Sequence, residues 1–145
     1  MIALHPPLSG MPLAFVALLT LLEVSRLVPS LRSSLRVTRR VLVCAVVVST
    51  IATFLSGYQA SSSLGDLNPV VQEELGSHHA WGRILLINSL LMGTFCWLSA
   101  RATHGRSALS VLYFVALAVQ LALSLSVGWM GGELVFGRGL GVRGH

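Results

Sequence analysis

Apolar residues fall into four long runs that are separated by short polar segments and together occupy most of the 145-residue chain. The runs cover about 8–28, 41–59, 80–100 and 108–130. Each run is close to the roughly 20 residues that a helix needs to cross the hydrocarbon core of a bilayer. The pattern therefore predicts an all-α, integral membrane four-helix bundle that forms a single domain, residues 1–145.

The polar segments between the runs predict how the helices are oriented. Residues 29–40 carry four arginines and no acid, residues 101–107 carry two more arginines, and residues 60–77 carry three acids and no basic residue. Short loops rich in Lys and Arg stay on the cytoplasmic side. We therefore expect the two arginine-bearing loops inside and both termini on the non-cytoplasmic side.

Composition agrees with a membrane protein and narrows the function. Hydrophobic residues make up 54% of the chain and charged residues only 10%, whereas about a quarter of the residues in soluble domains are charged. The net charge of +5 comes from arginines that flank the apolar runs and form no stripe with aromatic residues, so no nucleic-acid partner is expected. No nucleophile, phosphate-loop or zinc motif occurs, and we expect no catalytic activity of the chain's own.

Several polar residues within or beside the runs have simple structural interpretations. Glu23 and Arg26 are three residues apart on one helix face, which predicts a local ion pair near the interface. Asn88, Ser89 and Gln120 lie in mid-membrane positions, where hydrogen bonds between helices account for them.

The last run ends in a glycine-rich stretch, 128–142. Small residues let helices approach closely in lipid, and we expect this role of Gly128, Gly131 and Gly132. The polar residues that follow are expected to cap the bundle: Glu133, Arg138 and Arg143.

Three histidines are the candidates for a cofactor site. In the predicted topology His5, His78 and His79 all lie at the outer ends of the first and third spans. Two imidazoles from neighbouring helices can ligate the iron of haem b, which predicts one haem with His5 and His78 as metal ligands. His79 points about 100° away from His78, and the space left by Gly82, one turn below, favours His78. Arg83 is a candidate partner for a haem propionate.

The alternative is that these histidines are interfacial residues with one nitrogen in water. Ionisable residues are functional by default only when they are buried in the membrane, and these lie at its edge. The two interpretations differ in whether the imidazoles face one another inside the bundle.

The chain resembles a bacterial family of four-helix membrane proteins catalogued as domain of unknown function 2231. The resemblance rests on the His5-Pro6 start, the histidine that opens the third span and the ending GGELVFGRGLGV. It implies a haem-b membrane protein of the bacterial inner membrane. Many members have two further histidines, where this chain has Gly10 and Arg138, so at most one haem is implied, with His5 and either His78 or His79.

Together these observations predict a small membrane subunit, a haem-b-type electron-transfer or quinone-associated protein within a larger membrane complex. The alternative is a cofactor-free accessory subunit of a respiratory or photosynthetic complex. Both interpretations expect the lipid bilayer and other membrane-protein subunits as partners.

Overall fold

The computed structural model describes residues 5–65, 67–102 and 106–140, and the regular structure in these ranges is entirely helical. The elements in chain order are α1 (His5–Ser9), α2 (Met11–Ser25), the 3-10 turn η1 (Pro29–Leu31), α3 (Arg36–Ser61), α4 (Pro69–Arg101), α5 (Arg106–Gly132) and the π-helical turn η2 (Glu133–Gly137). The predicted all-α class is confirmed for this part of the chain.

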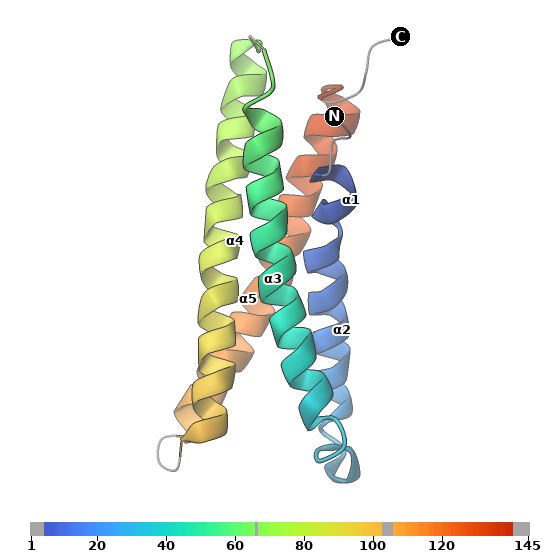
Figure 1. Ribbon diagram of the computed structural model, residues 1–145, viewed down its shortest axis with the longest axis vertical. Coiled ribbons are helices and arrows are strands. Elements are labelled where there is room, and N and C mark those ends of the chain that lie inside the picture. Colours follow the sequence, from blue (N-terminus) through green and yellow to red (C-terminus); the bar gives the residue numbers. More distant parts are fainter. Residues whose placement is uncertain (1–4, 66, 103–105, 141–145) are drawn as a thin grey trace.

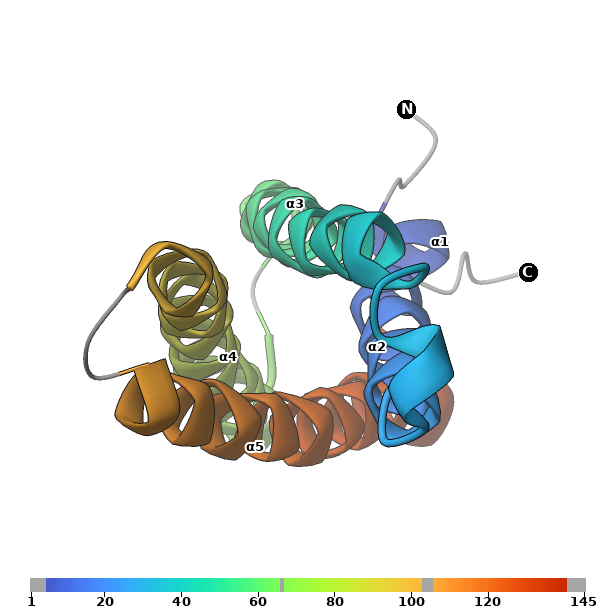
Figure 2. The same cartoon turned by 90° about the horizontal axis from the view of Figure 1, so that it is seen from below.

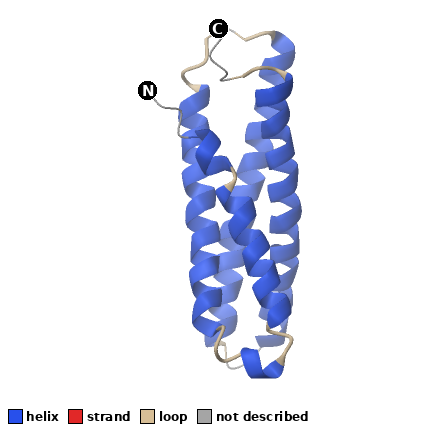
Figure 3. Cartoon of the chain, turned by 90° about the vertical axis from the view of Figure 1, so that its right-hand side faces the viewer, coloured by secondary structure: helices blue, strands red, loops and turns tan. Residues whose placement is uncertain are grey.

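The long helices lie side by side in an elongated bundle (Figures 1 and 3). The α2 helix packs on α3, and α4 packs on α5 over most of its length. Contacts between α3 and α4 and between α2 and α5 close the ring that is seen along the bundle axis in Figure 2. The chain thus folds as two helical hairpins packed against each other.

Three helical segments are long and apolar enough to cross a membrane: Arg36–Ser61, Pro69–Arg101 and Ala108–Gly137. The helix in the first expected span is shorter, because α2 covers only Met11–Ser25 and a turn at Gly10 separates it from α1. Gly10 has helical dihedrals, and its carbonyl accepts a hydrogen bond from the Ala14 amide at 3.1 Å. The α1 and α2 helices therefore follow one another, and 21 residues rise about 31 Å at helical spacing.

The acidic connection contributes more to the third helix than its sequence suggested. Residues 70–75, part of the acidic segment before the third apolar run, belong to the first turns of α4. The side chain of Asn68 accepts a hydrogen bond from the Val70 amide at 3.0 Å, and Pro69 occupies the first helical position. The Asn68 side chain pairs with one of the free backbone amides at the start of the helix, and Pro69 has no amide hydrogen that needs a partner. The α4 helix therefore begins well before its apolar run.

The basic segments lie at one end of the bundle, and the acidic segment lies at the other end. The η1 segment, the end of α4 and the start of α5 lie at the lower end in Figure 1, and the end of α3, the start of α4, α1 and η2 lie at the upper end. At the upper end, Arg138 forms a bidentate ion pair with Glu74, with N···O distances of 2.5 and 3.0 Å. This pair ties the segment after α5 to the start of α4. The third residue of the expected polar cap, Arg143, lies outside the described residues.

An extended apolar surface covers the outside of the bundle. Leu21, Val48 and Leu125 on three different helices are each more than half exposed, and Trp129 is 79% exposed. Soluble monomers rarely expose apolar patches larger than a few hundred Å². The apolar exterior and the three long apolar helices together indicate a lipid environment.

Glu23 is a buried acid in the core of the described part of the chain. The Glu23 side chain is only 4% exposed, and its carboxylate accepts hydrogen bonds from Arg26 (2.6 Å), Arg39 (2.6 Å) and the Tyr113 hydroxyl (2.8 Å). The guanidinium of Arg39 also lies over the Tyr113 ring, 4.3 Å from its centroid. The predicted Glu23–Arg26 pair is confirmed, and it is part of a network that joins α2, α3 and α5.

The mid-membrane polar residues of α4 and α5 also pair. The Asn88 side-chain amide donates to the Gln120 side-chain oxygen at 2.8 Å and to the Ala116 carbonyl at 2.9 Å. Ser89 donates within its own helix, to the Leu86 carbonyl. The predicted interhelical hydrogen bond is confirmed for Asn88 and Gln120, while Ser89 satisfies its hydroxyl locally.

Candidate functional site

The three histidines singled out in the sequence line a single cavity of about 250 Å³ near the upper end of the bundle. His5 comes from α1, and His78 and His79 come from α4. Apolar side chains from α3, α4 and α5 complete the walls, among them Phe54, Leu85 and Val127. The fold therefore brings together residues that are more than seventy positions apart in sequence.

His5 is held against α3. An added Cβ at Gly57 would lie 2.8 Å from Cε1 of the His5 ring, so the imidazole occupies the space that a larger residue would fill. The ring nitrogen Nδ1 lies 3.1 Å from the Ser56 hydroxyl, which donates its own proton to the Thr53 carbonyl at 2.9 Å. In the tautomer that carries its proton on Nδ1, the ring donates to this hydroxyl and keeps its lone pair on Nε2.

The surroundings of His5 disfavour its charged form. Burial lowers the pKa of His5 below its usual value, and the neighbouring His79 lowers it further, while the Thr53 carbonyl acts in the opposite direction. At neutral pH the ring is therefore neutral, which is the form that has a free nitrogen to accept a proton or bind a metal.

His78 is held against α5 in a similar way. An added Cβ at Gly131 would lie 3.2 Å from Cε1 of the His78 ring. Its Nδ1 atom is buried and has no hydrogen-bond partner. Among the described residues that line the cavity, it is the one fully buried side-chain nitrogen or oxygen without a partner, and such an unpaired atom costs about 1–3 kcal/mol.

His79 and Arg83 lie at the edge of the same cavity. The His79 ring has its centroid 6.2 Å from that of His78 and 6.4 Å from that of Tyr58 on α3. Arg83 is exposed and forms no ion pair with Glu133, although both residues are described. Of the adjacent pair, His78 has a buried ring nitrogen, and the choice of His78 over His79 as a ligand stays a prediction.

The sequence predicted the close contacts of the glycines in this bundle only in part. Gly131 was expected at a close contact, and it provides one, but its partner is a histidine ring. An added Cβ at Gly128 or Gly132 would meet nothing within 4 Å. Gly57 was missed as a packing position, although a glycine inside a helix near a histidine-bearing end was a usable signal.

The space next to Gly82 admits a methyl group and is bounded by Phe54. An added Cβ there would lie 3.8 Å from the Phe54 ring, which is ordinary van der Waals contact. The cavity of about 250 Å³ is smaller than the roughly 300–1,000 Å³ typical of pockets for drug-sized ligands, and haem is at least that large. The His5 ring packs against Gly57 of α3, and the His78 ring packs against Gly131 of α5. As it stands, the cavity is too small to enclose a haem macrocycle, and haem ligation by His5 and His78 stays a prediction.

No group of three or more His, Cys, Asp or Glu side chains that could hold a metal ion occurs within the described residues. The two positions where the resembled family has further histidines lie elsewhere. Gly10 has open space beside it, and Arg138 is engaged by Glu74.

The chain matches no family model, no curated protein and no solved structure.

Proposed function

We propose that this protein is a small membrane subunit whose histidine cavity binds the headgroup of a quinone or quinol within a larger membrane complex. The observation that carries this proposal is that His5 and His78 line one cavity, and that the buried Nδ1 of His78 has no hydrogen-bond partner. A ring-shaped ligand with a carbonyl or hydroxyl oxygen supplies the missing hydrogen bond.

The size and lining of the cavity suit such a headgroup. A volume of about 250 Å³ holds one flat six-membered ring with small substituents, and ligand sites combine mostly apolar walls with a few placed polar groups. Phe54, Leu85 and Val127 provide apolar walls. The prenyl tail of a quinone extends into the lipid that surrounds the bundle.

The two histidines have complementary roles in this proposal. His78 donates its Nδ1 proton to a quinone carbonyl. His5, in the tautomer that donates its Nδ1 proton to Ser56, accepts a hydrogen bond at Nε2 from a quinol hydroxyl. The site thus offers one donor and one acceptor, and electrons come from or go to a partner subunit.

The proposed placement in the membrane follows from charge. The arginine-bearing end of the bundle is cytoplasmic under the positive-inside rule, the first apolar run, about 8–28, makes the first of four spans with His5 outside it, and the histidine cavity lies toward the non-cytoplasmic face of a bacterial inner membrane. The exposed apolar sides of the helices provide the surface for neighbouring subunits.

A binding titration tests the proposal. The purified protein in lipid nanodiscs is titrated with a short-chain benzoquinone, and the dissociation constant is measured for the parent, for His78→Leu and for the matched variant His79→Leu. Loss of one buried hydrogen bond, worth about 1–3 kcal/mol, predicts at least a several-fold weaker binding for His78→Leu. His79→Leu, at the cavity edge, is expected to bind within about twofold of the parent.

Equal affinities in the two variants contradict the proposed role of His78. A parent protein that binds no quinone and has no haem absorbance supports the cofactor-free accessory subunit. A haem spectrum that is lost in His5→Leu and His78→Leu supports haem ligation, which requires the helices to separate from the arrangement described above.

A further inference from the structure

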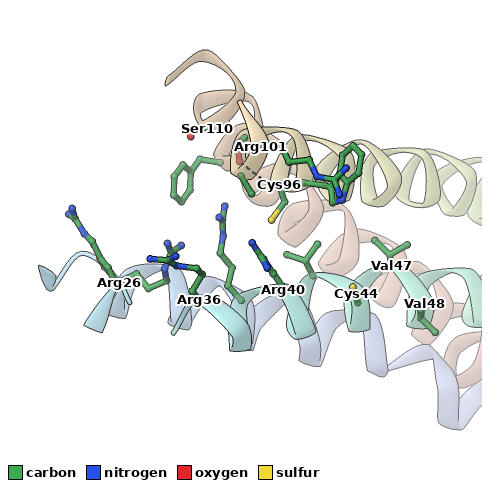
Figure 4. A pocket seen from close by; sticks show the side chains of 17 residues that line it. Arg26, Arg36, Arg40, Cys44, Val47, Val48, Cys96, Arg101 and Ser110 are labelled. Atoms are coloured by element: carbon green, nitrogen blue, oxygen red, sulfur yellow. Dashed lines mark hydrogen bonds between the residues drawn. The ribbon is translucent and has the colours of Figure 1, made fainter. Parts of the chain in front are cut away.

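A second and larger cavity, of about 1,000 Å³, lies at the opposite end of the bundle. It lies between α3 and α4, and Figure 4 shows Arg26, which follows α2, and residues of α3 along one wall, with residues of α4 and α5 along the facing wall. Six arginines line it and no acid does: Arg26, Arg32, Arg36, Arg39, Arg40 and Arg101.

Most of this positive charge has no counter-ion in the described part of the chain. Glu23 alone pairs with two of the arginines, Arg26 and Arg39. Arg32 donates to the Arg26 carbonyl, which leaves its charge uncompensated. Arg101 lies over the Trp97 ring, 3.6 Å from its centroid. These contacts orient guanidinium groups without neutralising them.

One donor in the lining is also orphaned. The Nε atom of Arg26 is buried and has no hydrogen-bond partner, although the Nη1 atom of the same side chain bonds Glu23. Clustered guanidinium groups repel one another, and an anion with several oxygens satisfies such donors with strong, charge-assisted hydrogen bonds. The arginine end of the cavity is thus built for a phosphate-like group.

The rest of the lining is apolar. From Arg40 the cavity continues along α3 past Val43, Val47 and Val48, and on the facing side past Trp97 of α4 and Phe114 of α5. Val48 and Trp97 are both more than half exposed on the apolar exterior. A free phosphate ion makes no favourable contact with this apolar wall, whereas an acyl chain packs along it.

We propose that this cavity binds an anionic phospholipid, with the headgroup phosphate among the arginines and an acyl chain along the apolar wall between α3 and α4. Basic pockets between transmembrane helices are suited to anionic headgroups. This site lies at the other end of the bundle from the histidine cavity and is independent of the proposed quinone binding.

Lipid titration of the purified full chain tests this site. Native mass spectrometry and thermal unfolding are recorded with a dianionic diphosphatidyl lipid, with zwitterionic phosphatidylcholine and with inorganic phosphate. We expect each protein molecule to retain one molecule of the dianionic lipid. Of the three additives, only this lipid should raise the unfolding temperature. The double variant Arg36→Gln/Arg40→Gln removes two charges near the headgroup, each worth about 1 kcal/mol of binding free energy. Because about 1.4 kcal/mol corresponds to tenfold in affinity, we expect the affinity for the anionic lipid to fall about thirtyfold.

The controls separate the sources of the effect. Arg36 and Arg40 are exposed and lie outside the Glu23 network, so the variant is expected to fold, and Arg40→Lys, which keeps the charge, should retain most of the binding. Arg138→Gln, at the other end of the bundle, should respond to the lipid as the parent does. Equal binding by the double variant overturns the proposal. An equal shift with inorganic phosphate also overturns it, in favour of a soluble anion.

Discussion

Glu23 is a buried acid whose three partners come from three different helices. Arg26 is one turn away in sequence, while Arg39 and Tyr113 approach from α3 and α5. Burying two ions is costly, and a buried pair is favourable only when hydrogen bonds satisfy the remaining atoms. The Tyr113 hydroxyl, which shares the carboxylate oxygen Oε1 with Arg39, contributes to that satisfaction.

We predict that Tyr113→Phe lowers the free energy of unfolding by about 1.5–3 kcal/mol, the usual value for a hydrogen bond to a charged group. The matched control is Tyr58→Phe, because the Tyr58 side chain is 68% exposed and exposed substitutions change stability by about 0.5 kcal/mol or less. Unfolding in mixed detergent measures both. Equal stabilities of the two variants would show that the hydroxyl of Tyr113 adds nothing.

Gly57 and Gly128 offer a second matched pair, because both are helical glycines but only Gly57 contacts a histidine ring. An added methyl group at Gly57 lies 2.8 Å from the His5 ring and forces it away, whereas at Gly128 it meets nothing within 4 Å. Burial lowers the pKa of His5. We therefore predict that Gly57→Ala raises the pKa of His5 toward 6.5 and that Gly128→Ala leaves it unchanged, as measured by NMR titration.

The sign of the associated pH dependence follows from the lowered pKa. The folded protein binds the His5 proton less readily than the unfolded chain does, so this group's contribution to stability is present above about pH 6.5 and is lost as the pH falls below it. In Gly57→Ala this loss on acidification should be smaller. A His5 pKa that is the same in parent and variant would contradict the packing of the ring on Gly57.

Contacts within one helix could be predicted from the sequence, and some between helices could not. The Glu23–Arg26 pair follows from spacing, and the Asn88–Gln120 bond follows from the cost of leaving polar groups unpaired in lipid. No spacing rule connects Arg39 or Tyr113 to Glu23, because their approach depends on how α3 and α5 rotate about their axes. For the same reason, the seating of His5 on α3 and of His78 on α5 could not be predicted.

At the scale of elements, hydropathy predicted the helices because each must satisfy its own backbone in lipid. The limits of the helices depend on local chemistry. Asn68 and Pro69 start α4 before its apolar run, and the interruption at Gly10 divides the first run into α1 and α2. Hydropathy is insensitive to both features, since a helix that emerges from the bilayer is no longer apolar.

The helix order yields a prediction about sidedness. With four spans and the arginine-bearing loops inside, a reporter fused after residue 145 should be active only outside the cytoplasm, and a reporter inserted in residues 29–35 only inside it. Charge is the physical reason, since arginine-rich short loops are retained on the cytoplasmic side. A cytoplasmic signal from the C-terminal fusion would show that the first apolar run does not cross the membrane, or that the orientation is reversed.

At the scale of the whole molecule, the bundle has two cavities at opposite ends with different chemistry. The upper one is small and lined by histidines, and the lower one is larger and lined by arginines. The Glu23 network and the Asn88–Gln120 bond hold the helices together between them. The arrangement suits a subunit that is anchored by a lipid near one face and holds a headgroup near the other.

The most direct test of the central claim is what the protein carries when it is purified gently from membranes that contain a natural quinone pool. Organic extraction followed by chromatography measures quinone per chain, and one visible spectrum of the same sample measures haem. The account predicts a substoichiometric to equimolar amount of quinone, a strong decrease in His78→Leu, little change in His79→Leu, and no haem absorbance. Quinone at the level of an unrelated membrane protein, or a haem spectrum that depends on His5 and His78, would contradict it.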